Sequence, residues 1–269
     1  MSFSRTTRAV LLALSSLVLL FVYAPLALVV LNSFNTSRTF EWPPSGFTTR
    51  WWSTAVENPG ARNAIVVSVE VALMATAVAL VLGTMAALAL QRFRFFGRDA
   101  VSLLVILPIA LPGVVTGIAL ANAFLTMFGI ELGLFSLVVS HATFCMVTVF
   151  NNAIARLRRL GGNLEEASMD LGAGTFRTFW SVTLPMMRSA LLAGALLSFA
   201  LSFDEIIVTT FTAGSGIQTL PIWIYQNLFR PNQAPVVNVV AAALIVLSVV
   251  PIWLSQRLAG TDEAVAAAR

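Results

Sequence analysis

Long apolar stretches separated by short polar segments dominate the hydropathy pattern of the chain. An α-helix of about 20 residues crosses the ~30 Å hydrocarbon core of a bilayer, whereas a transmembrane β-strand needs an alternating pattern. The stretches are continuous and cover about residues 9–31, 64–90, 100–127, 134–154, 189–211 and 236–254. The pattern therefore predicts an all-α integral membrane protein, built as a six-helix bundle.

The arginines indicate which ends of these helices face the cytoplasm, because loops on that side of a membrane are enriched in positive charge. With the N-terminus inside, twelve of the 16 basic residues lie on the cytoplasmic side. The four on the outer side are Arg38, Arg50, Arg62 and Arg230. We therefore expect both termini in the cytoplasm. The expected organisation is a tail over 1–8, a transmembrane domain over 9–254 with a long inner loop over 155–188, and a tail over 255–269.

The composition fits a lipid environment and excludes several kinds of chemistry. Hydrophobic residues make up 58% of the chain and charged residues 10%, whereas soluble domains carry about 25% charged residues. All 16 basic residues are arginine, so the chain lacks the lysine that a phosphate-binding P-loop requires. With Cys145 as the only cysteine, no metal site is expected. Arginine-rich cytoplasmic loops explain the pI of about 10.5, so no nucleic-acid partner is expected.

The third predicted span contains residues that bend helices and residues that allow close helix contact. Pro108 and Pro112 lie about one helical turn apart, and each removes a backbone donor. Gly113 and Gly117 follow with the spacing of a G-x-x-x-G contact face. A similar small-residue stripe in the fifth span consists of Ala190, Gly194 and Ser198. We expect Pro108, Pro112 and Gly113 to form a hinge, although bundle packing without gating explains the same residues.

The inner loop over 155–188 is the most polar part of the chain, and it predicts two short helices with a break between them. Asn163 can cap the first helix, and Glu165 and Glu166 fall in its first turn, where the helix dipole favours acids. Gly172 and Gly174 are suited to end it. The first helix is therefore expected to be short and acidic at its start.

The second short helix of this loop presents large aromatic side chains. Thr175 can cap it, and Phe176, Phe179 and Trp180 follow. Pro185 is expected to stop the chain before the fifth span. Exposed apolar patches usually dock onto a partner or pack back onto their own protein. The aromatic side chains therefore predict one of these two contacts.

The same loop resembles a motif of a known family. Permeases of ATP-binding-cassette importers carry E-A-A, three residues, G, nine residues and then I-x-L-P. The matching positions in this chain are Glu166, Ala167, Ser168, Gly172, Val182, Leu184 and Pro185. Ser168 replaces an alanine and Val182 replaces the isoleucine, while the spacing is unchanged.

This resemblance implies a type I importer transmembrane fold in the bacterial inner membrane, crossing it several times, with no catalytic site in this chain. It implies that the loop forms a coupling helix in a groove of a separate ATPase. The implied coupling residues are Glu166, Ala167, Gly172, Phe176, Phe179, Trp180, Leu184 and Pro185. The implied partners are a second permease subunit, expected to be a distinct homologue, two ATPase subunits and a periplasmic or lipid-anchored substrate-binding protein. ATP and magnesium would bind the ATPase subunits, and no cofactor is expected on this chain.

Further segments are similar to the spermidine/putrescine branch of these permeases, and this similarity covers nearly the whole chain. The segments are 32–34 after the first span, 140–145 in the fourth and 201–208 in the fifth. The resemblance implies polyamine uptake by alternating access. The chain departs from it at one position: many members carry an acid after the proline equivalent to Pro112, where this chain has Gly113.

Carboxylates within the predicted spans fit a cationic cargo, because an acid in a membrane is costly and usually faces a wet cavity or a partner. Asp204 lies 16 residues beyond Arg188, about 24 Å along a helix. Glu70 lies eight residues beyond Arg62, about 12 Å along a helix. We expect Asp204 to attract the ammonium groups of a polyamine, with Glu205 rotated by about 100° on the same helix. Pairing of either acid with a neighbouring subunit, and a structural role for Glu70, stay open.

Two other classes of function stay open from the sequence. An importer of another small solute, such as an amino-acid derivative, an anion or a metal chelate, would have the same fold. A membrane-embedded enzyme would need a nucleophile with its base or a metal cluster, and the acids are scattered apart from two adjacent pairs. His141 is the only histidine, and we expect a hydrogen-bonded bundle residue rather than a proton relay.

Overall fold

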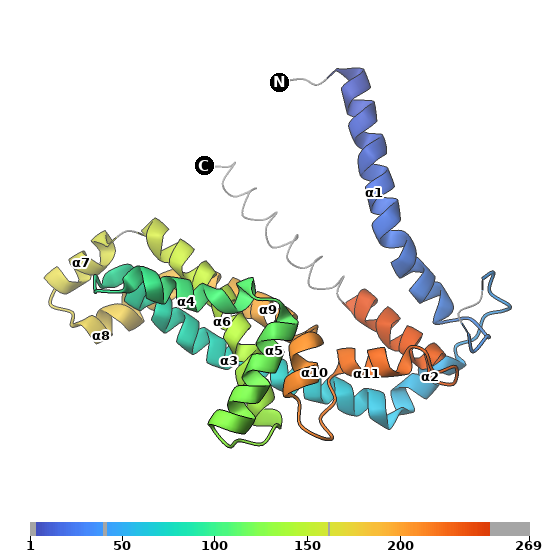
Figure 1. Cartoon of the computed structure of the whole chain (residues 1–269). Coiled ribbons are helices and arrows are strands. Elements are labelled where there is room, and N and C mark those ends of the chain that lie inside the picture. Colours follow the sequence, from blue (N-terminus) through green and yellow to red (C-terminus); the bar gives the residue numbers. More distant parts are fainter. Residues whose placement is uncertain (1–3, 40–41, 161, 248–269) are drawn as a thin grey trace. The chain divides into compact units, whose positions relative to one another are not determined.

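The computed structural model describes residues 4–39, 42–160 and 162–247, and nearly all of this part is helical (Figure 1). The helices are α1 Arg5–Asn32, α2 Arg50–Glu57, α3 Pro59–Arg92, α4 Arg98–Ala110, α5 Gly113–Asn122, the π-helix η1 Ala123–Met127, α6 Leu134–Leu160, α7 Asn163–Asp170, α8 Thr175–Thr178, the π-helix η2 Phe179–Thr183, α9 Leu184–Phe203, α10 Ile207–Thr212, α11 Leu220–Asn227 and a last helix Ala234–Leu247. Within the described residues the chain forms two compact units, one over Asn63–Trp223 and one that combines Met1–Arg62 with Ile224–Arg269.

Four helices of the described part are long and apolar enough to cross a membrane. They are α1, α3, α6 and the continuous helix Thr175–Phe203, which joins α8, η2 and α9. A fifth crossing is possible if the bent pair of α4 with Gly113–Met127 counts as one span. The predicted last span, 236–254, and the predicted tail over 255–269 extend beyond the described residues. The count of six spans and the location of the termini therefore stay predictions.

The third predicted span, 100–127, is not one helix. Its two halves are bent by 108° relative to each other at a break after Ala110. Leu111 at this break has the extended backbone angles φ −84° and ψ 144°, because the ring of Pro112 disfavours a helical residue before it. Pro108 lies inside α4, which continues for two residues beyond it. The expected discontinuity therefore occurs at Pro112.

The fifth predicted span, 189–211, differs from the observed helix at both ends. The helix already begins at Thr175 and continues through Pro185, so the prediction that Pro185 stops the chain is wrong. Pro185 lies in the first turn of α9, directly after the π-helical turn of η2. This turn changes the hydrogen-bonding register, so the N–H group that proline lacks is not needed there. At the other end, the helix stops at Phe203 and α10 starts only at Ile207.

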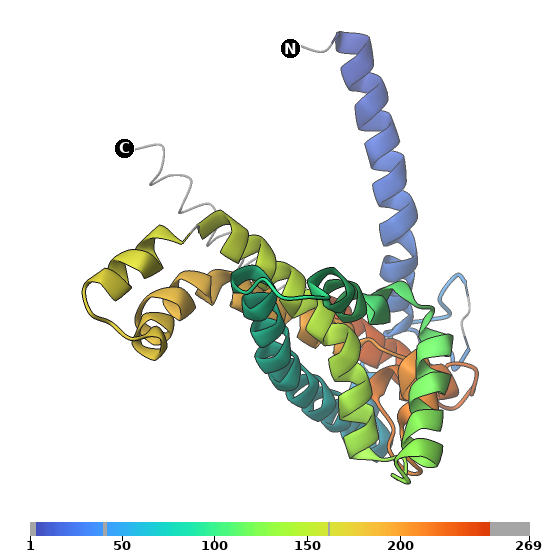
Figure 2. The same ribbon diagram turned by 60° about the vertical axis from the view of Figure 1, so that its left-hand side comes forward.

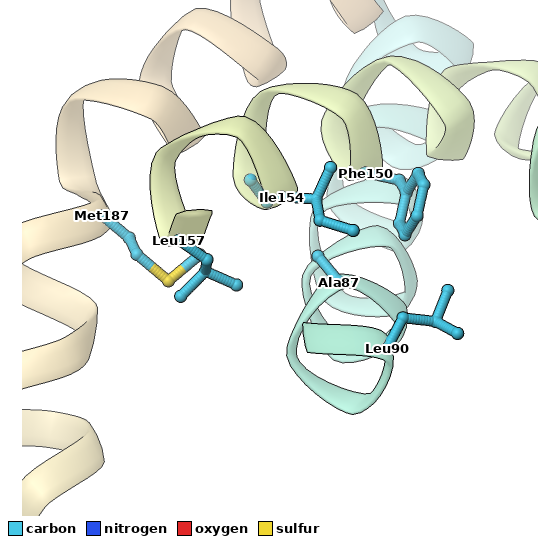
Figure 3. Close-up of a cluster of buried hydrophobic side chains, with 7 residues drawn as sticks. Ala87, Leu90, Phe150, Ile154, Leu157 and Met187 are labelled. Atoms are coloured by element: carbon cyan, nitrogen blue, oxygen red, sulfur yellow. The ribbon is translucent and has the colours of Figure 1, made fainter. Parts of the chain in front are cut away.

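The larger unit is centred on α6, which packs along α9. Gly194 allows this approach, because a Cβ atom there would lie 3.2 Å from Val149 Cα. The hydroxyl of Ser198 donates to the carbonyl oxygen of Cys145 at 3.1 Å, which confirms the small-residue stripe as a helix contact. A cluster of buried side chains joins α6 and α9 to α3 at the ends of these helices next to the loop over 155–188 (Figure 3). Its members are Ala87, Leu90, Phe150, Ala153, Ile154, Leu157 and Met187.

Within this unit, α7 and α8 lie at one end of the α6–α9 pair, and α5 and α10 lie at the other end (Figures 1 and 2). The loop over 155–188 and the acids Asp204 and Glu205, which are the two candidate sites of this unit, therefore lie at opposite ends of α9.

The smaller unit contains α1, whose apolar side chains are mostly exposed, as in a helix that contacts lipid or another helix. The segment after α1 is ordered by hydrogen bonds. Trp51 Nε1 donates to the carbonyl oxygen of Asn35 at 2.8 Å, and Asn58 Nδ2 donates to Gln233 Oε1 at 3.2 Å.

Candidate functional site

The loop over 155–188 contains one separate short helix, α7, followed by a turn, so the prediction holds for the first short helix. The prediction of a second short helix is wrong, because α8 is the start of the continuous helix Thr175–Phe203, and residues 155–160 belong to α6. Gly172 ends the first helix with a left-handed backbone, φ +86°, which a residue without a Cβ atom adopts at low cost. The caps differ from the prediction by one residue. The N-caps are Gly162 and Gly174, and Asn163 and Thr175 are the first helical residues. Glycine has no side chain for a capping hydrogen bond, so the contacts that position these helices come from other residues.

An aromatic patch lies on the outside of this loop, formed by Phe176 and Trp180. Their side chains are 76% and 54% exposed, and their rings contact each other edge-on with centroids 6.2 Å apart. Phe179 is half-buried and packs its ring against Trp180. Leu171, which the sequence interpretation did not single out, adds a side chain that is 90% exposed. The side chains of Phe176 and Trp180 are therefore not buried against the described residues of their own unit, and docking of a partner stays a prediction.

The inner side of the loop is held by Glu165. This residue is 9% exposed, and its carboxylate forms an ion pair with Arg92 at the end of α3. The hydroxyl of Thr183 donates to the same carboxylate oxygen at 2.5 Å. Glu166 and Ala167, the motif residues, are exposed. Adjacent residues on a helix point about 100° apart, so one acid of the pair anchors the loop and the other faces outward.

The remaining motif residues lie where the loop enters α9. Leu184 is half-buried and Pro185 is exposed. The hydroxyl groups of Ser168 in α7 and Thr178 in α8 are 3.1 Å apart, which ties the two short helices together. The loop is therefore a supported structure with an exposed outer face.

At the other end of α9, the two acids Asp204 and Glu205 lie in a break rather than in a helix. Asp204 is the C-cap of α9, with φ −93° and ψ 0°, and the prediction of a continuous helix with the acids about 100° apart is wrong. Glu205 Oε1 accepts a hydrogen bond from the backbone N–H of Val208 at 2.8 Å, so it caps the start of α10. Asp204 is exposed, and its carboxylate has no hydrogen bond or ion pair within the part of the chain that the structure describes.

The other predicted site residues lie on neighbouring elements. Glu70 is exposed on α3, and no hydrogen bond or ion pair joins its carboxylate to another described residue. A Cβ atom at Gly113 would lie 3.3 Å from Ile207, and one at Gly117 would lie 2.9 Å from Phe211. The predicted glycine face is thus a close contact between α5 and α10. It places the break before α5 beside the break before α10. A steric reason accompanies the absence of an acid at position 113, since any side chain on Gly113 would contact Ile207.

Comparisons with known proteins agree with this geometry. The sequence profile of a family described as binding-protein-dependent transport system inner membrane component matches residues 79–260. The spermidine/putrescine transport system permease protein PotC of Escherichia coli K12 is 36% identical over 240 residues, which cover 89% of each chain. The putrescine transport system permease protein PotI of the same organism is 34% identical over 232 residues, which cover 84% of this chain and 82% of PotI.

Solved structures share the fold at low sequence identity. A chain of a bacterial ABC transporter involved in the import of the acidic polysaccharide alginate matches with a TM-score of 0.72 and 15% identity, covering 97% of this chain and 99% of its own. A chain of an amino acid ABC transporter matches with a TM-score of 0.53 and 16% identity, covering 75% and 98%. The chain therefore belongs to the family of binding-protein-dependent transport system inner membrane components, and it is the permease component of an ABC importer in the inner membrane.

Proposed function

We propose that this permease subunit moves polyamines such as putrescine and spermidine across the bacterial inner membrane by alternating access. The observation that carries the proposal is the carboxylate of Asp204, which is exposed and unpaired among the described residues at a break between two apolar helices. The two relatives, whose names specify spermidine/putrescine and putrescine transport, support the same cargo.

The electrostatics of the break favour a cation. A carboxylate within a membrane is costly unless water or a counter-charge reaches it, so an exposed Asp204 favours a wet cavity or a cation beside it. The carbonyl groups at the C-terminal end of α9 add partial negative charge beside it. Glu205 is engaged by Val208, so Asp204 is the acid available to an ammonium group. Glu70 is a second exposed acid of the same unit and a candidate for the same pathway.

Energy enters the permease through the loop over 155–188. In this proposal the outer face from Glu166 to Trp180 docks into a groove of a partner ATPase, which binds ATP and magnesium and hydrolyses the nucleotide. Gly172 supplies the turn, and Leu184 and Pro185 connect the loop to α9. The family further implies a second permease subunit, here proposed to be a distinct homologue, and a substrate-binding protein outside the membrane. The hinge at Pro108, Pro112 and Gly113 belongs to the same proposal, since the bend after Ala110 lies beside α10.

Uptake of radiolabelled putrescine and spermidine by the assembled transporter tests the cargo. We expect Asp204→Asn to lower uptake at least about 10-fold, because one charge-assisted contact contributes about 1.5–3 kcal/mol. Asp204→Glu, which keeps the charge, should retain more uptake than Asp204→Asn. Glu131→Gln serves as the matched control, since Glu131 is an exposed acid in the turn between η1 and α6. Unchanged uptake by an assembled Asp204→Asn transporter would discard the role of this acid.

A further inference from the structure

His141 in α6 is fully buried, and both of its ring nitrogens have partners on the chain that contains the helix break. Nδ1 lies 2.7 Å from Ser202 Oγ, and Nε2 lies 2.9 Å from Thr209 Oγ1. The expectation of a hydrogen-bonded bundle residue is therefore confirmed. Ser202 is in the last turn of α9 and Thr209 is in the first turn of α10. One imidazole ring thus connects the two helix ends across residues 204–206.

We assign the directions of these hydrogen bonds from the donors that each group has. The hydroxyl of Thr209 donates its single hydrogen to the carbonyl oxygen of Glu205 at 2.8 Å, so its oxygen accepts from Nε2–H of His141. A neutral imidazole then offers only an acceptor at Nδ1, and the hydroxyl of Ser202 donates to it. The result is a directed chain of hydrogen bonds from α9 to the carbonyl group of Glu205 inside the break.

Other contacts hold α10 in the same place. The hydroxyl of Ser136 in α6 donates to the carbonyl oxygen of Thr212 at 2.9 Å, at the far end of α10. Gly113 and Gly117 of α5 bring a second helix against Ile207 and Phe211. With α10 fixed by α6 and α5, the bridge through His141 determines how the end of α9 meets it.

We propose that His141 is a positioning residue for transport, which holds the break so that the carboxylate of Asp204 stays exposed to the cargo. The proposal rests on the function proposed above for Asp204. His141 does not contact the cargo, because it is fully buried. Its contribution is the bridge between the end of α9 and the start of α10. Transporters often build their binding sites from discontinuous helices within the membrane.

Two substitutions separate the bridge from simple packing. His141→Leu removes both hydrogen bonds, and the freed hydroxyl of Ser202 can then donate to a carbonyl group of its own helix. His141→Gln keeps one donor and one acceptor. Thr143→Val is the matched control on α6, since Thr143 makes only a local hydrogen bond to the carbonyl oxygen of Ser140. Each variant is assembled with its partner subunits and reconstituted in proteoliposomes.

The first measurement is independent of uptake. In a Cys145→Ser background, Asp204→Cys is labelled with a membrane-impermeant thiol reagent, with and without His141→Leu. We expect His141→Leu to change the labelling rate at least about 5-fold and Thr143→Val to leave it within about 2-fold. An unchanged rate overturns the positioning role, whatever the cargo is.

The second measurement is a double-substitution cycle on polyamine uptake. We expect His141→Leu to raise KM at least about 10-fold with a smaller change in maximal rate, and His141→Gln to recover most of the loss. In the Asp204→Asn background His141→Leu should add less than about 2-fold, since the acid that it positions is already neutral. An equal loss in both backgrounds overturns the inference. If Asp204→Asn alone leaves uptake intact, the cargo proposal fails, and the labelling result then decides the positioning role.

Discussion

Arg92, the last residue of α3, forms an ion pair with Glu165 in the first turn of α7. The pair joins the C-terminal end of one helix to the N-terminal end of another, so each charge also lies where a helix dipole favours it. Thr183 donates to the same carboxylate, which adds η2 to the contact. The loop proposed to dock the ATPase is therefore attached to α3 as well as to the helices before and after it.

Loss of this ion pair should loosen α7. The side chains are 35% and 12% exposed, so water screens the pair only in part, and we expect Glu165→Gln to weaken the local structure by about 1–2 kcal/mol. Hydrogen exchange of the α7 amides measures this directly, and the rate should rise several-fold. Arg94→Gln, at an exposed arginine just beyond α3, is the control. Equal exchange in Glu165→Gln and the unmodified protein would contradict the expectation.

The aromatic patch should be required for binding the ATPase subunit. Phe176→Ala with Trp180→Ala removes two exposed aromatic side chains, and aromatic residues are the usual anchors of interfaces. We expect co-purification of the ATPase subunit to fall at least about 10-fold. Phe96→Ala is a matched control, because Phe96 is a fully exposed aromatic residue of the turn between α3 and α4. Intact complex assembly and uptake in the double variant would exclude the patch as the docking surface.

Two glycines of the loop allow a test of backbone conformation alone. An added Cβ atom would meet nothing within 4 Å at either Gly172 or Gly174, but only Gly172 has a positive φ. We expect Gly172→Ala to destabilise the turn by about 1 kcal/mol and Gly174→Ala to cost less. Limited proteolysis of the loop in the assembled transporter compares the two variants. Equal cleavage rates would show that the left-handed turn is not what shapes the loop.

The long helices were predictable because apolar run length alone identifies them. A run of 20 or more apolar residues leaves few alternatives to a membrane helix, and α1, α3 and α6 match their predicted ranges closely. The break at Leu111 was predictable for a local reason as well, since Pro112 restricts the residue before it.

The interruptions that depend on tertiary contacts were not predictable in the same way. Pro185 reads as a helix stop, but the π-helical turn of η2 accommodates it. The break after Phe203 has no proline, and the side chains of Glu205 and His141 stabilise it through contacts that the sequence alone does not reveal. The motif drew attention to Glu166, whereas the buried partner of Arg92 is the preceding acid, Glu165. The sequence showed that both acids lie in the first turn of the helix, but it did not show which of the two side chains points inward.

The uninterrupted helix from Thr175 to Phe203 has a mechanical consequence. Its 29 residues extend about 43 Å, with the aromatic patch at one end and Asp204 next to the other. Because one helix carries both, a displacement of Phe176 would be transmitted along the helix toward the acid, and the π-helical turn of η2 with Pro185 marks the place where this helix can bend. In the proposed mechanism, the contact with the ATPase and the contact with the cargo would then lie at the two ends of one helix.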